Sequence, residues 1–377
     1  MSDVKPLRVG VLGCGNIAKQ YFKAAKKFHH LEVVACADLR REVAEAAAAE
    51  FGVPAVLTVD ELIDAPNVDC VLNLTIPAAH VEMGRRAIAA GKHVYGEKPL
   101  GIDRSEGAKL IADAEAAGLR VGTAPDTFLG GGQQTARDAI DRGLIGRPLH
   151  FSAQMLSPGT ESWHPNPKFF YERGGGPMFD MGPYYLTALV NLFGPIDRVA
   201  AFTDKKIPTR TITHDKDMPG SKHGQSFEVE VPDHHTGVIR FASGVTGTLT
   251  TSFATPVRGN HDWKRPITVY GTEGAMLVPD PNVFDRTVRR KGPKDDEFID
   301  LPYATPTGYG RAVGLADMAQ AIATGRDHRC SGALGQHVLD AMASFLDSGE
   351  KGAFVAMSST AERPAPLPAE LPDGLLD

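Results

Sequence analysis

A GxGxxA motif near the N-terminus has the spacing of a turn that binds phosphate. It follows an apolar run and opens a stretch with helical periodicity. Gly13 permits a tight turn, Gly15 lets the backbone approach a pyrophosphate, and Ala18 lets the helix pack closely on the strand. The first helical turn, with Asn16 and Ile17, offers free N–H groups to phosphate oxygens. The motif predicts a dinucleotide site.

Asp38 indicates which dinucleotide the turn would bind. It ends the next apolar run, 23 residues after Gly15. From that position a carboxylate can accept hydrogen bonds from both ribose hydroxyls of the adenosine half. A 2′-phosphate would be repelled there, so we expect NAD. Arg40 leaves NADP open, because a guanidinium two residues away could bind that phosphate.

The segments around this motif alternate between strand and helix up to residue 124. Short apolar runs without polar alternation are separated by helical stretches, which is typical of a parallel sheet covered on both faces. We therefore predict a dinucleotide-binding domain over residues 1–124. The predicted strands are 7–13, 31–37, 55–58, 68–75, 93–96 and 120–124, and the predicted helices are 16–28, 40–51, 78–90 and 103–117.

After Pro125 the pattern changes. Strands between residues 198 and 277 have one apolar and one polar side, which is typical of an antiparallel sheet with an exposed face. We predict a second domain over residues 125–355 and a Pro-rich extended tail over 356–377. The predicted helices of the second domain are 131–142, 177–192, 312–323 and 334–347, and its predicted strands include 149–156, 227–231, 237–241 and 247–253.

Composition limits the class of protein. The 377 residues are 42% hydrophobic and 23% charged, which is ordinary for a globular chain of two or three domains. We expect no membrane span and no secretion signal. A net charge of −6 argues against nucleic-acid binding. The four cysteines form no CxxC pair, so we expect buried thiols in a cytoplasmic protein and no metal site.

Five segments together resemble the family named for glucose–fructose oxidoreductase, inositol dehydrogenase and the rhizopine catabolism protein (Gfo/Idh/MocA). The segments are 10–18, 75–80, 90–100, 174–184 and 270–275. The resemblance implies an N-terminal Rossmann domain with a parallel sheet, then a domain with a large, open, mainly antiparallel sheet. It also implies hydride transfer between a nicotinamide and a carbinol carbon. We therefore expect an NAD(P)-dependent sugar or polyol dehydrogenase.

The resemblance also implies catalytic residues. Lys98, in the Glu97-Lys-Pro segment, would stabilise an alkoxide at the end of a strand. Tyr184 replaces the family's usual acid/base histidine, and to act as a base at pH 7 its pKa must fall by about three units from ~10. Lys98 and an oxidised nicotinamide could lower it. Asp180 lies four residues earlier, so a helix would place both on one face, where Asp180 could bind sugar hydroxyls. A core tyrosine and a helix-capping aspartate are the alternatives.

Further contacts are expected around this centre. The resemblance implies cofactor contacts for Thr75, His80 and Glu97. Trp163 and His164 lie in the loop before the helix that carries Asp180, where we expect them to contact the substrate, or alternatively the cofactor. Two other functions stay open: turnover with a retained cofactor, either between two sugars or in glycoside cleavage, and nucleotide sensing. An open sheet buries its exposed face against a partner, so we expect a homodimer or homotetramer formed through it.

Overall fold

The computed structural model describes residues 5–217, 220–257, 264–371 and 376. The chain divides into two compact units. Unit 1 comprises residues 1–134, 303–339 and 364–377, and unit 2 comprises residues 135–302 and 340–363. The predicted domains, 1–124, 125–355 and 356–377, are contiguous in sequence, whereas each unit is built from separate segments.

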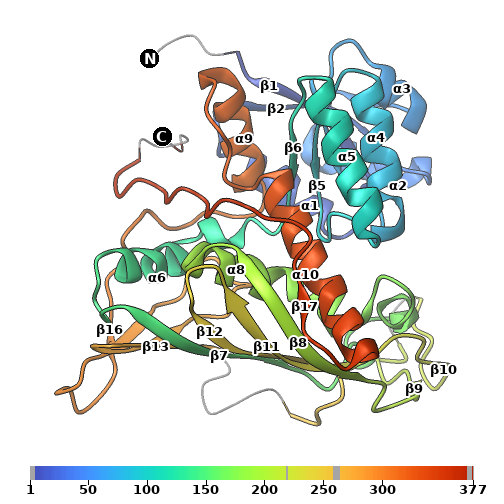
Figure 1. Ribbon diagram of the computed structural model, residues 1–377. Coiled ribbons are helices and arrows are strands. Elements are labelled where there is room, and N and C mark those ends of the chain that lie inside the picture. The colour runs from blue at the N-terminus through green and yellow to red at the C-terminus, as the bar shows by residue number, and fades with distance from the viewer. Residues whose placement is uncertain (1–4, 218–219, 258–263, 372–375, 377) are drawn as a thin grey trace. The chain divides into compact units, whose positions relative to one another are not determined.

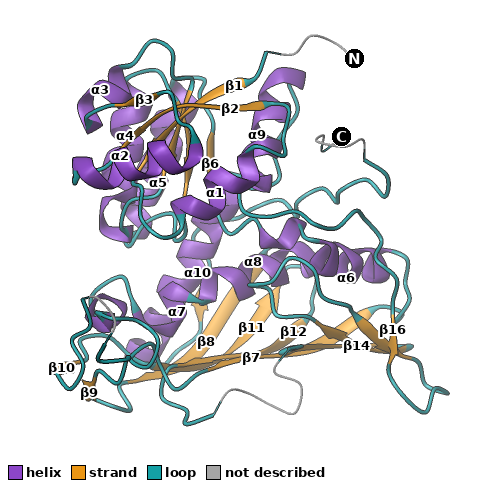
Figure 2. Cartoon of the chain, turned by 180° about the vertical axis from the view of Figure 1, so that it is seen from behind, coloured by secondary structure: helices purple, strands orange, loops and turns teal. Residues whose placement is uncertain are grey.

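Unit 1 contains a six-stranded sheet in the order β3-β2-β1-β4-β5-β6, in which every pair is parallel. Helix α1 packs against α2 and α9, and α4 packs against α3 and α5, so helices cover both faces (Figures 1 and 2). The predicted Rossmann sheet is confirmed. Its strands are β1 (Leu7–Leu12), β2 (Leu31–Ala37), β3 (Ala55–Val56), β4 (Cys70–Asn73), β5 (His93–Gly96) and β6 (Val121–Thr123).

The helices of unit 1 include one that the sequence analysis missed. They are α1 (Ala18–Ala25), α2 (Arg41–Phe51), α3 (Val59–Asp64), α4 (His80–Ala89), α5 (Arg104–Ala116) and α9 (Val313–Thr324). Helix α3 is only six residues long, but a capping box marks it, in which Glu61 N–H donates to the Thr58 hydroxyl and Thr58 N–H donates to the Glu61 carboxylate. Helix α9 contacts β6, which explains why residues far along the chain join unit 1.

Unit 2 contains a nine-stranded sheet in the order β16-β15-β14-β13-β7-β12-β11-β8-β17. Only β7 and β12 pair in parallel, so the predicted, mainly antiparallel sheet is confirmed. The strands are β7 (Pro148–Leu156), β8 (Ile196–Asp204), β11 (His234–Phe241), β12 (Thr246–Ser252), β13 (Ile267–Gly271), β14 (Gly274–Val278), β15 (Arg289–Lys291), β16 (Ile299–Asp300) and β17 (Val355–Ala356).

Helices lie over one face of this sheet and leave its other face bare in the described part of the chain (Figure 1). The covered face carries Phe151, Val199, Ile239 and Leu249, none more than 1% exposed. Alternate residues of the same strands point outward, because successive side chains of a strand lie on opposite faces. The helices are α6 (Gly131–Asp141), α7 (Gly176–Asp180), α8 (Gly182–Phe193) and α10 (Gly332–Lys351), the last spanning both units.

Two predictions in this part of the chain need correction. The helix predicted over 177–192 is two helices, because Pro183 has no N–H to continue the ladder and the Tyr184 N–H bonds to Met181 O instead. The strand predicted over 227–231 is β10 (Ser226–Glu228), which pairs with β9 (Thr209–Thr211) in a separate sheet. The predicted extended tail packs on unit 1, where Leu367 N–H donates to Gln134 Oε1 at 2.8 Å.

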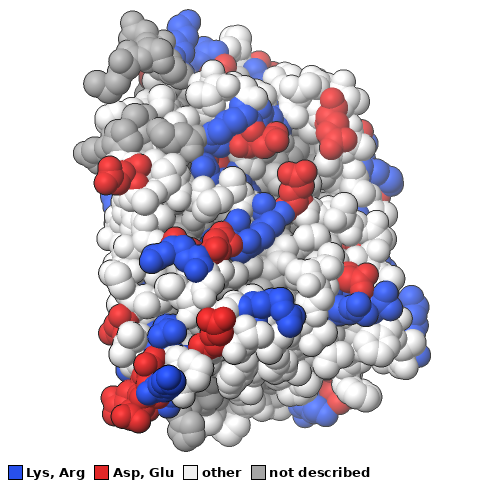
Figure 3. All heavy atoms as spheres, turned by 60° about the vertical axis from the view of Figure 1, so that its left-hand side comes forward, with Lys and Arg blue, Asp and Glu red and all other residues white. Residues whose placement is uncertain are grey.

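Both signs of charge occur together on the surface that Figure 3 shows. On the face shown in Figure 3, Lys and Arg side chains are interspersed with Asp and Glu. No helix among the described residues is long and apolar enough to cross a membrane.

Candidate active site

The two glycines of the N-terminal turn are required for different reasons. Gly13 has a φ of +95°, and a Cβ there would lie 2.7 Å from Leu74 O at the end of β4. The positive φ and the close approach of Leu74 O therefore both require glycine at this position. A Cβ at Gly15 would meet no described atom within 4 Å. Gly15 thus leaves open space beside the start of α1, which fits close approach of a pyrophosphate to the backbone.

Asp38 ties the end of β2 to this turn. Its carboxylate accepts one hydrogen bond from Cys14 N–H and another from Arg40 N–H, both at 2.9 Å. Each carboxylate oxygen has a second lone pair, so acceptor capacity remains for ribose hydroxyls. Asp38 therefore orients the turn and fits the predicted role toward an adenosine ribose. These residues fit a bound NAD, which would bring a hydride acceptor to the carboxyl edge of the sheet.

Two exposed apolar residues beside the turn were missed by the sequence analysis. Leu39, directly after Asp38, is 94% exposed, and Ile76, directly after Thr75, is 66% exposed. They follow β2 and β4, on either side of the turn that follows β1. Large aliphatic side chains at two strand ends can contact the flat faces of an adenine. The sequence could have indicated both residues, because each directly follows a polar residue, Asp38 or Thr75, near the end of a strand.

His80 braces the backbone rather than presenting a ring nitrogen to a ligand. Nδ1 lies 2.7 Å from Pro99 O, and Nε2 lies 3.1 Å from Thr75 O. The ring is 3% exposed, and burial lowers the pKa of His80. Both ring nitrogens face carbonyl oxygens, so a ligand could meet only the carbon atoms of the ring, and the contact between His80 and the cofactor stays a prediction. Whichever nitrogen carries the proton, His80 lies between the loop after β4 and the segment after Lys98.

Lys98 lies just beyond β5, at the same edge of the sheet as the glycine turn. Its N–H donates to Glu97 Oε2 at 3.0 Å, and Glu97 Oε1 accepts from the Tyr21 hydroxyl at 2.9 Å. Glu97 is 8% exposed. The predicted cofactor residue Glu97 therefore uses both carboxylate oxygens within unit 1, and it fixes the backbone of Lys98.

A buried ion pair lies in the same unit. Asp126 is fully buried, 3.6 Å from Arg311 Nη1, and it accepts a hydrogen bond from Gly314 N–H in the first turn of α9. Burial raises the pKa of Asp126 to about 6, against the opposing effect of Arg311. Asp126 lies in the segment just after β6, and Arg311 lies just before α9, so the pair joins two distant segments of unit 1.

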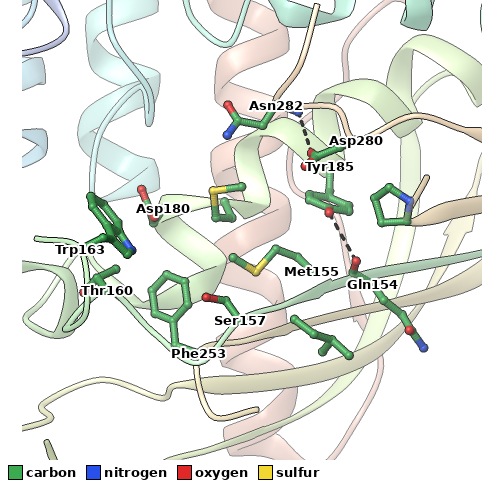
Figure 4. A pocket seen from close by; sticks show the side chains of 13 residues that line it. Gln154, Met155, Ser157, Thr160, Trp163, Asp180, Tyr185, Phe253, Asp280 and Asn282 are labelled. Carbon is green, nitrogen blue, oxygen red and sulfur yellow. Dashed lines mark hydrogen bonds between the residues drawn. The ribbon is translucent and has the colours of Figure 1, made fainter. Parts of the chain in front are cut away.

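Unit 2 contains a cavity of about 240 Å³ against the covered face of its sheet. Trp163, Thr160 and Asp180 lie on one side of it, and Tyr185 and Asp280 lie on the other (Figure 4). Carboxylates accept hydrogen bonds from hydroxyl groups, and aromatic faces contact the apolar face of a sugar ring. The remaining lining residues are Gln154, Met155, Leu156, Ser157, Met181, Phe253, Pro266 and Asn282.

The break between α7 and α8 separates the two predicted catalytic residues of this unit. Asp180 is the last residue of α7, whereas Tyr184 is the third residue of α8. Tyr184 is 6% exposed and does not line the described cavity, while its neighbour Tyr185 does. The expectation that one continuous helix places Asp180 and Tyr184 on one face is therefore wrong.

Tyr185 is a cavity residue that sequence reasoning missed. Its hydroxyl donates to Gln154 O at 3.3 Å (Figure 4). Burial, together with the charge of Asp280, raises the pKa of Tyr185, so it stays protonated as a donor at neutral pH. The adjacent pair Tyr184-Tyr185 was visible in the sequence, but only the helix break shows which of them faces this cavity.

The loop that carries Trp163 and His164 is an aromatic cluster. Trp163 makes edge contacts with His164 and Phe170, and His164 makes edge contacts with Phe169 and Phe170, with ring centroids 5.2–5.6 Å apart. Trp163 is 52% exposed and lines the cavity. His164 Nδ1 accepts from Asn166 N–H, and burial lowers the pKa of His164. The cavity lining contains Trp163 but not His164.

Arg210 anchors this loop from within the core of unit 2. Its guanidinium donates to Glu161 Oε1 at 2.6 Å and to Asp233 Oδ2 at 2.8 Å, and it stacks on the Tyr171 ring. Arg210 is 4% exposed, and the Tyr171 hydroxyl donates to Glu161 Oε2. A planar guanidinium that bonds two carboxylates fixes its partners in one geometry. The loop beside the cavity is therefore held in place.

Both units match one protein family. Residues 7–124 match the family described as an oxidoreductase family with an NAD-binding Rossmann fold. Residues 133–277 match the GFO/IDH/MocA C-terminal domain. The two matches lie on either side of the sequence-predicted boundary at residue 124.

Named relatives act on sugars and cyclitols. The chain is 30% identical over 276 residues to a 1,5-anhydro-D-fructose reductase from Ensifer adhaerens, covering 72% of this chain and 75% of that protein. It is 25% identical over 284 residues to a myo-inositol 2-dehydrogenase from Thermotoga maritima, covering 75% and 77%. A levoglucosan dehydrogenase solved with NADH and levoglucosan has a similar fold, with a TM-score of 0.78 and 23% identity over 94% of this chain and 99% of that one.

Proposed function

We propose, from the premise that this chain belongs to the Gfo/Idh/MocA oxidoreductase family, that it is an NAD-dependent dehydrogenase of a neutral sugar or polyol. One observation carries the proposal. The glycine turn after β1 and Lys98 after β5 lie at the same carboxyl edge of one parallel sheet, where nucleotides bind in such folds. The turn would hold the phosphates of a dinucleotide at this edge, and Lys98 lies at the same edge to act on the substrate.

In this reaction a carbinol carbon loses a hydride and its hydroxyl loses a proton, leaving a ketone or a lactone. Bound NAD supplies the hydride acceptor. Lys98 binds the carbinol oxygen and stabilises the developing negative charge. Tyr184 accepts the hydroxyl proton, and Asp180 and Trp163 bind the remaining hydroxyls and the apolar face of the ring. Asp38 selects NAD over NADP by binding the free ribose diol.

The cavity of unit 2 supports the substrate class. Its volume of about 240 Å³ is below the range of about 300–1,000 Å³ typical of drug-sized ligands, so it suits a single ring. The relatives named above act on an anhydrosugar and a cyclitol, and the similar structure holds levoglucosan. We infer a substrate of this size and polarity.

A panel assay tests the proposal. Purified protein is incubated with myo-inositol, D-xylose, D-glucose or levoglucosan and with NAD or NADP, and nicotinamide reduction is followed by absorbance; reduction of 1,5-anhydro-D-fructose is followed with NADH. We expect turnover of at least one ring substrate, with the higher kcat/KM for NAD. Product formation from sugar pairs without added nucleotide would replace the proposal with a cofactor-retaining reaction. Nucleotide binding without turnover of any panel member would favour a sensor.

We also propose that two copies associate through the bare face of the sheet of unit 2. The strand register places an uncharged row across this face: Ala200, Val238, Thr248, Ser152, Thr268 and Leu277. Val238 is 44% exposed and lies second in this row, between Ala200 and Thr248. Burial of such a face against a second copy removes apolar surface from water.

The association is tested by light scattering on Val238→Glu. A carboxylate buried at the centre of an interface is costly, so we expect a shift toward monomer. Val257→Glu is the matched control, because Val257 is 67% exposed and belongs to no strand of this sheet. A dimer in both variants, or a monomeric wild type, would contradict the proposed interface.

We place the protein in the cytoplasm, supported by its four cysteines, which are all buried free thiols.

A further inference from the structure

A buried hydrogen-bond chain connects helix α1 with Lys98. Tyr21, the fourth residue of α1, is 1% exposed, and its hydroxyl donates to Glu97 Oε1 at 2.9 Å. The other oxygen of the same carboxylate accepts the Lys98 N–H at 3.0 Å. Tyr21 and Lys98 are 77 residues apart in the chain, and Glu97 bridges them.

The chemistry of Glu97 makes this bridge specific. A buried carboxylate is costly unless hydrogen-bond donors satisfy it, and bonds to an ionised acceptor are among the stronger ones. The Tyr21 hydroxyl sets the rotation of the carboxylate and thereby the position of the Lys98 N–H. Burial, with the nearby charge of Glu97, raises the pKa of Tyr21, so its hydroxyl remains a donor across the physiological range.

The backbone beyond Lys98 is held independently. His80 Nδ1 lies 2.7 Å from Pro99 O, one residue after Lys98. The backbone of Lys98 is therefore fixed by Glu97 on one side and by His80 on the other. The Lys98 side chain extends from this fixed backbone, so the Cα atom from which the ammonium chain starts has little freedom to move.

We propose that Tyr21 is a positioning residue for Lys98 and acts on it through Glu97. The inference rests on the proposed function, because it presumes that Lys98 stabilises the reacting oxygen. Tyr21 itself takes no part in proton or hydride transfer. A displacement of Lys98 by a fraction of an ångström weakens its contact with the developing oxyanion, and such misplacements of catalytic groups lower kcat strongly.

The test compares Tyr21→Phe with Tyr95→Phe. Tyr95 is an equally buried tyrosine on β5 of the same unit, and its hydroxyl interacts with the Cys330 thiol and not with Glu97. Each substitution removes one oxygen. We expect Tyr21→Phe to lower kcat about tenfold with KM for NAD within twofold, and to raise the deuterium isotope effect with a substrate deuterated at the reacting carbon. Tyr95→Phe should keep kcat within twofold of wild type.

Two measurements distinguish a positioning role from a structural one. In a Lys98→Ala background, Tyr21→Phe should cause no further loss of kcat, because its effect passes through Lys98. In the absence of nucleotide, the NMR signal of ¹³C-dimethylated Lys98, assigned by its loss in Lys98→Arg, should shift in Tyr21→Phe and not in Tyr95→Phe.

The possible results separate the positioning role of Tyr21 from the catalytic role of Lys98. Wild-type kcat in a folded Tyr21→Phe, an equal loss in Tyr95→Phe, or additive losses with Lys98→Ala would overturn the positioning role alone. If Lys98→Ala retains its kcat, the proposed role of Lys98 fails first. Should Tyr21→Phe fail to fold, Glu97→Gln keeps an oxygen for Lys98 N–H and a donor toward Tyr21, so it should retain far more kcat than Glu97→Ala; equal losses would overturn the proposal.

Discussion

The two units assemble their candidate sites in different ways. In unit 1 the residues concerned follow strands directly: Gly13 after β1, Asp38 after β2, Thr75 after β4 and Lys98 after β5. In unit 2 the cavity is lined by residues from segments as distant as Gln154 and Asn282. A parallel sheet brings successive strand ends to one edge, so local motifs suffice there. A cavity against an antiparallel sheet depends on how loops and helices pack, which no local motif encodes.

The largest expected effect tests which tyrosine of α8 does chemistry. Tyr184→Phe should lower kcat by about 10²–10⁴-fold, because it removes the general base of hydride transfer. The rise of the oxidative rate with pH should vanish with it. Tyr185→Phe should cost less than tenfold, since that hydroxyl donates to Gln154 O and is a structural or binding contact. Steady-state pH profiles of both variants decide the matter, and the reverse order would move the base into the cavity of unit 2.

Removal of Lys98 tests whether unit 1 contributes a catalytic group or only a nucleotide site. Lys98→Ala should reduce kcat by about 10²-fold or more, the size expected for a charge at a developing oxyanion. NADH affinity, titrated by fluorescence, should change little. A variant with near wild-type turnover would restrict unit 1 to nucleotide binding.

Substitution of Asp38 should have a smaller effect, on nucleotide binding at the carboxyl edge of the same parallel sheet. Asp38→Ala should raise KM for NAD by about tenfold, because it loses the acceptor for the ribose diol, the bond from Cys14 N–H that orients the turn and the bond from Arg40 N–H. The preference for NAD over NADP should relax. A wild type with the higher kcat/KM for NADP would show that Arg40 governs the site.

The smallest expected effect concerns stability against acid, and it too separates the units. His235 of unit 2 is 1% exposed, and burial lowers its pKa to about 4, against about 6.5 when unfolded. Its neutral form stabilises the fold above pH 6.5, and this contribution is lost as pH falls toward 4. Between pH 7.5 and 5 the loss is about 2 kcal/mol.

His328 of unit 1 provides the comparison. Burial also lowers its pKa to about 4, but its side chain is only half-buried, so we expect a shallower dependence. Urea unfolding at the two pH values should lose more of its pH dependence in His235→Gln than in His328→Gln. Equal slopes in wild type and His235→Gln would show that this histidine stays accessible to protons.

Several features followed from the sequence because their causes are local. The bounds of β2 and β5 agree with prediction, since each is an apolar run closed by a polar residue or glycine. The GxGxxA turn and Asp38 were identified from spacing alone, because chain geometry between consecutive strands leaves few places for them. Helix α3 carried a readable capping box at Thr58 and Glu61, so its omission was avoidable.

Other features were decided only by tertiary structure, because their causes join residues far apart in the chain. The surroundings of His80 are one example, because Pro99 O and Thr75 O approach its two ring nitrogens. The bond from Tyr21 to Glu97 and the ion pairs of Arg210 have no sequence signature. Segment 303–339 joins unit 1 because α9 finds its apolar contacts on β6. Sequence thus determined the nucleotide turn and the class of chemistry, whereas burial and long-range hydrogen bonds decided which side chains are fixed in position at the candidate sites.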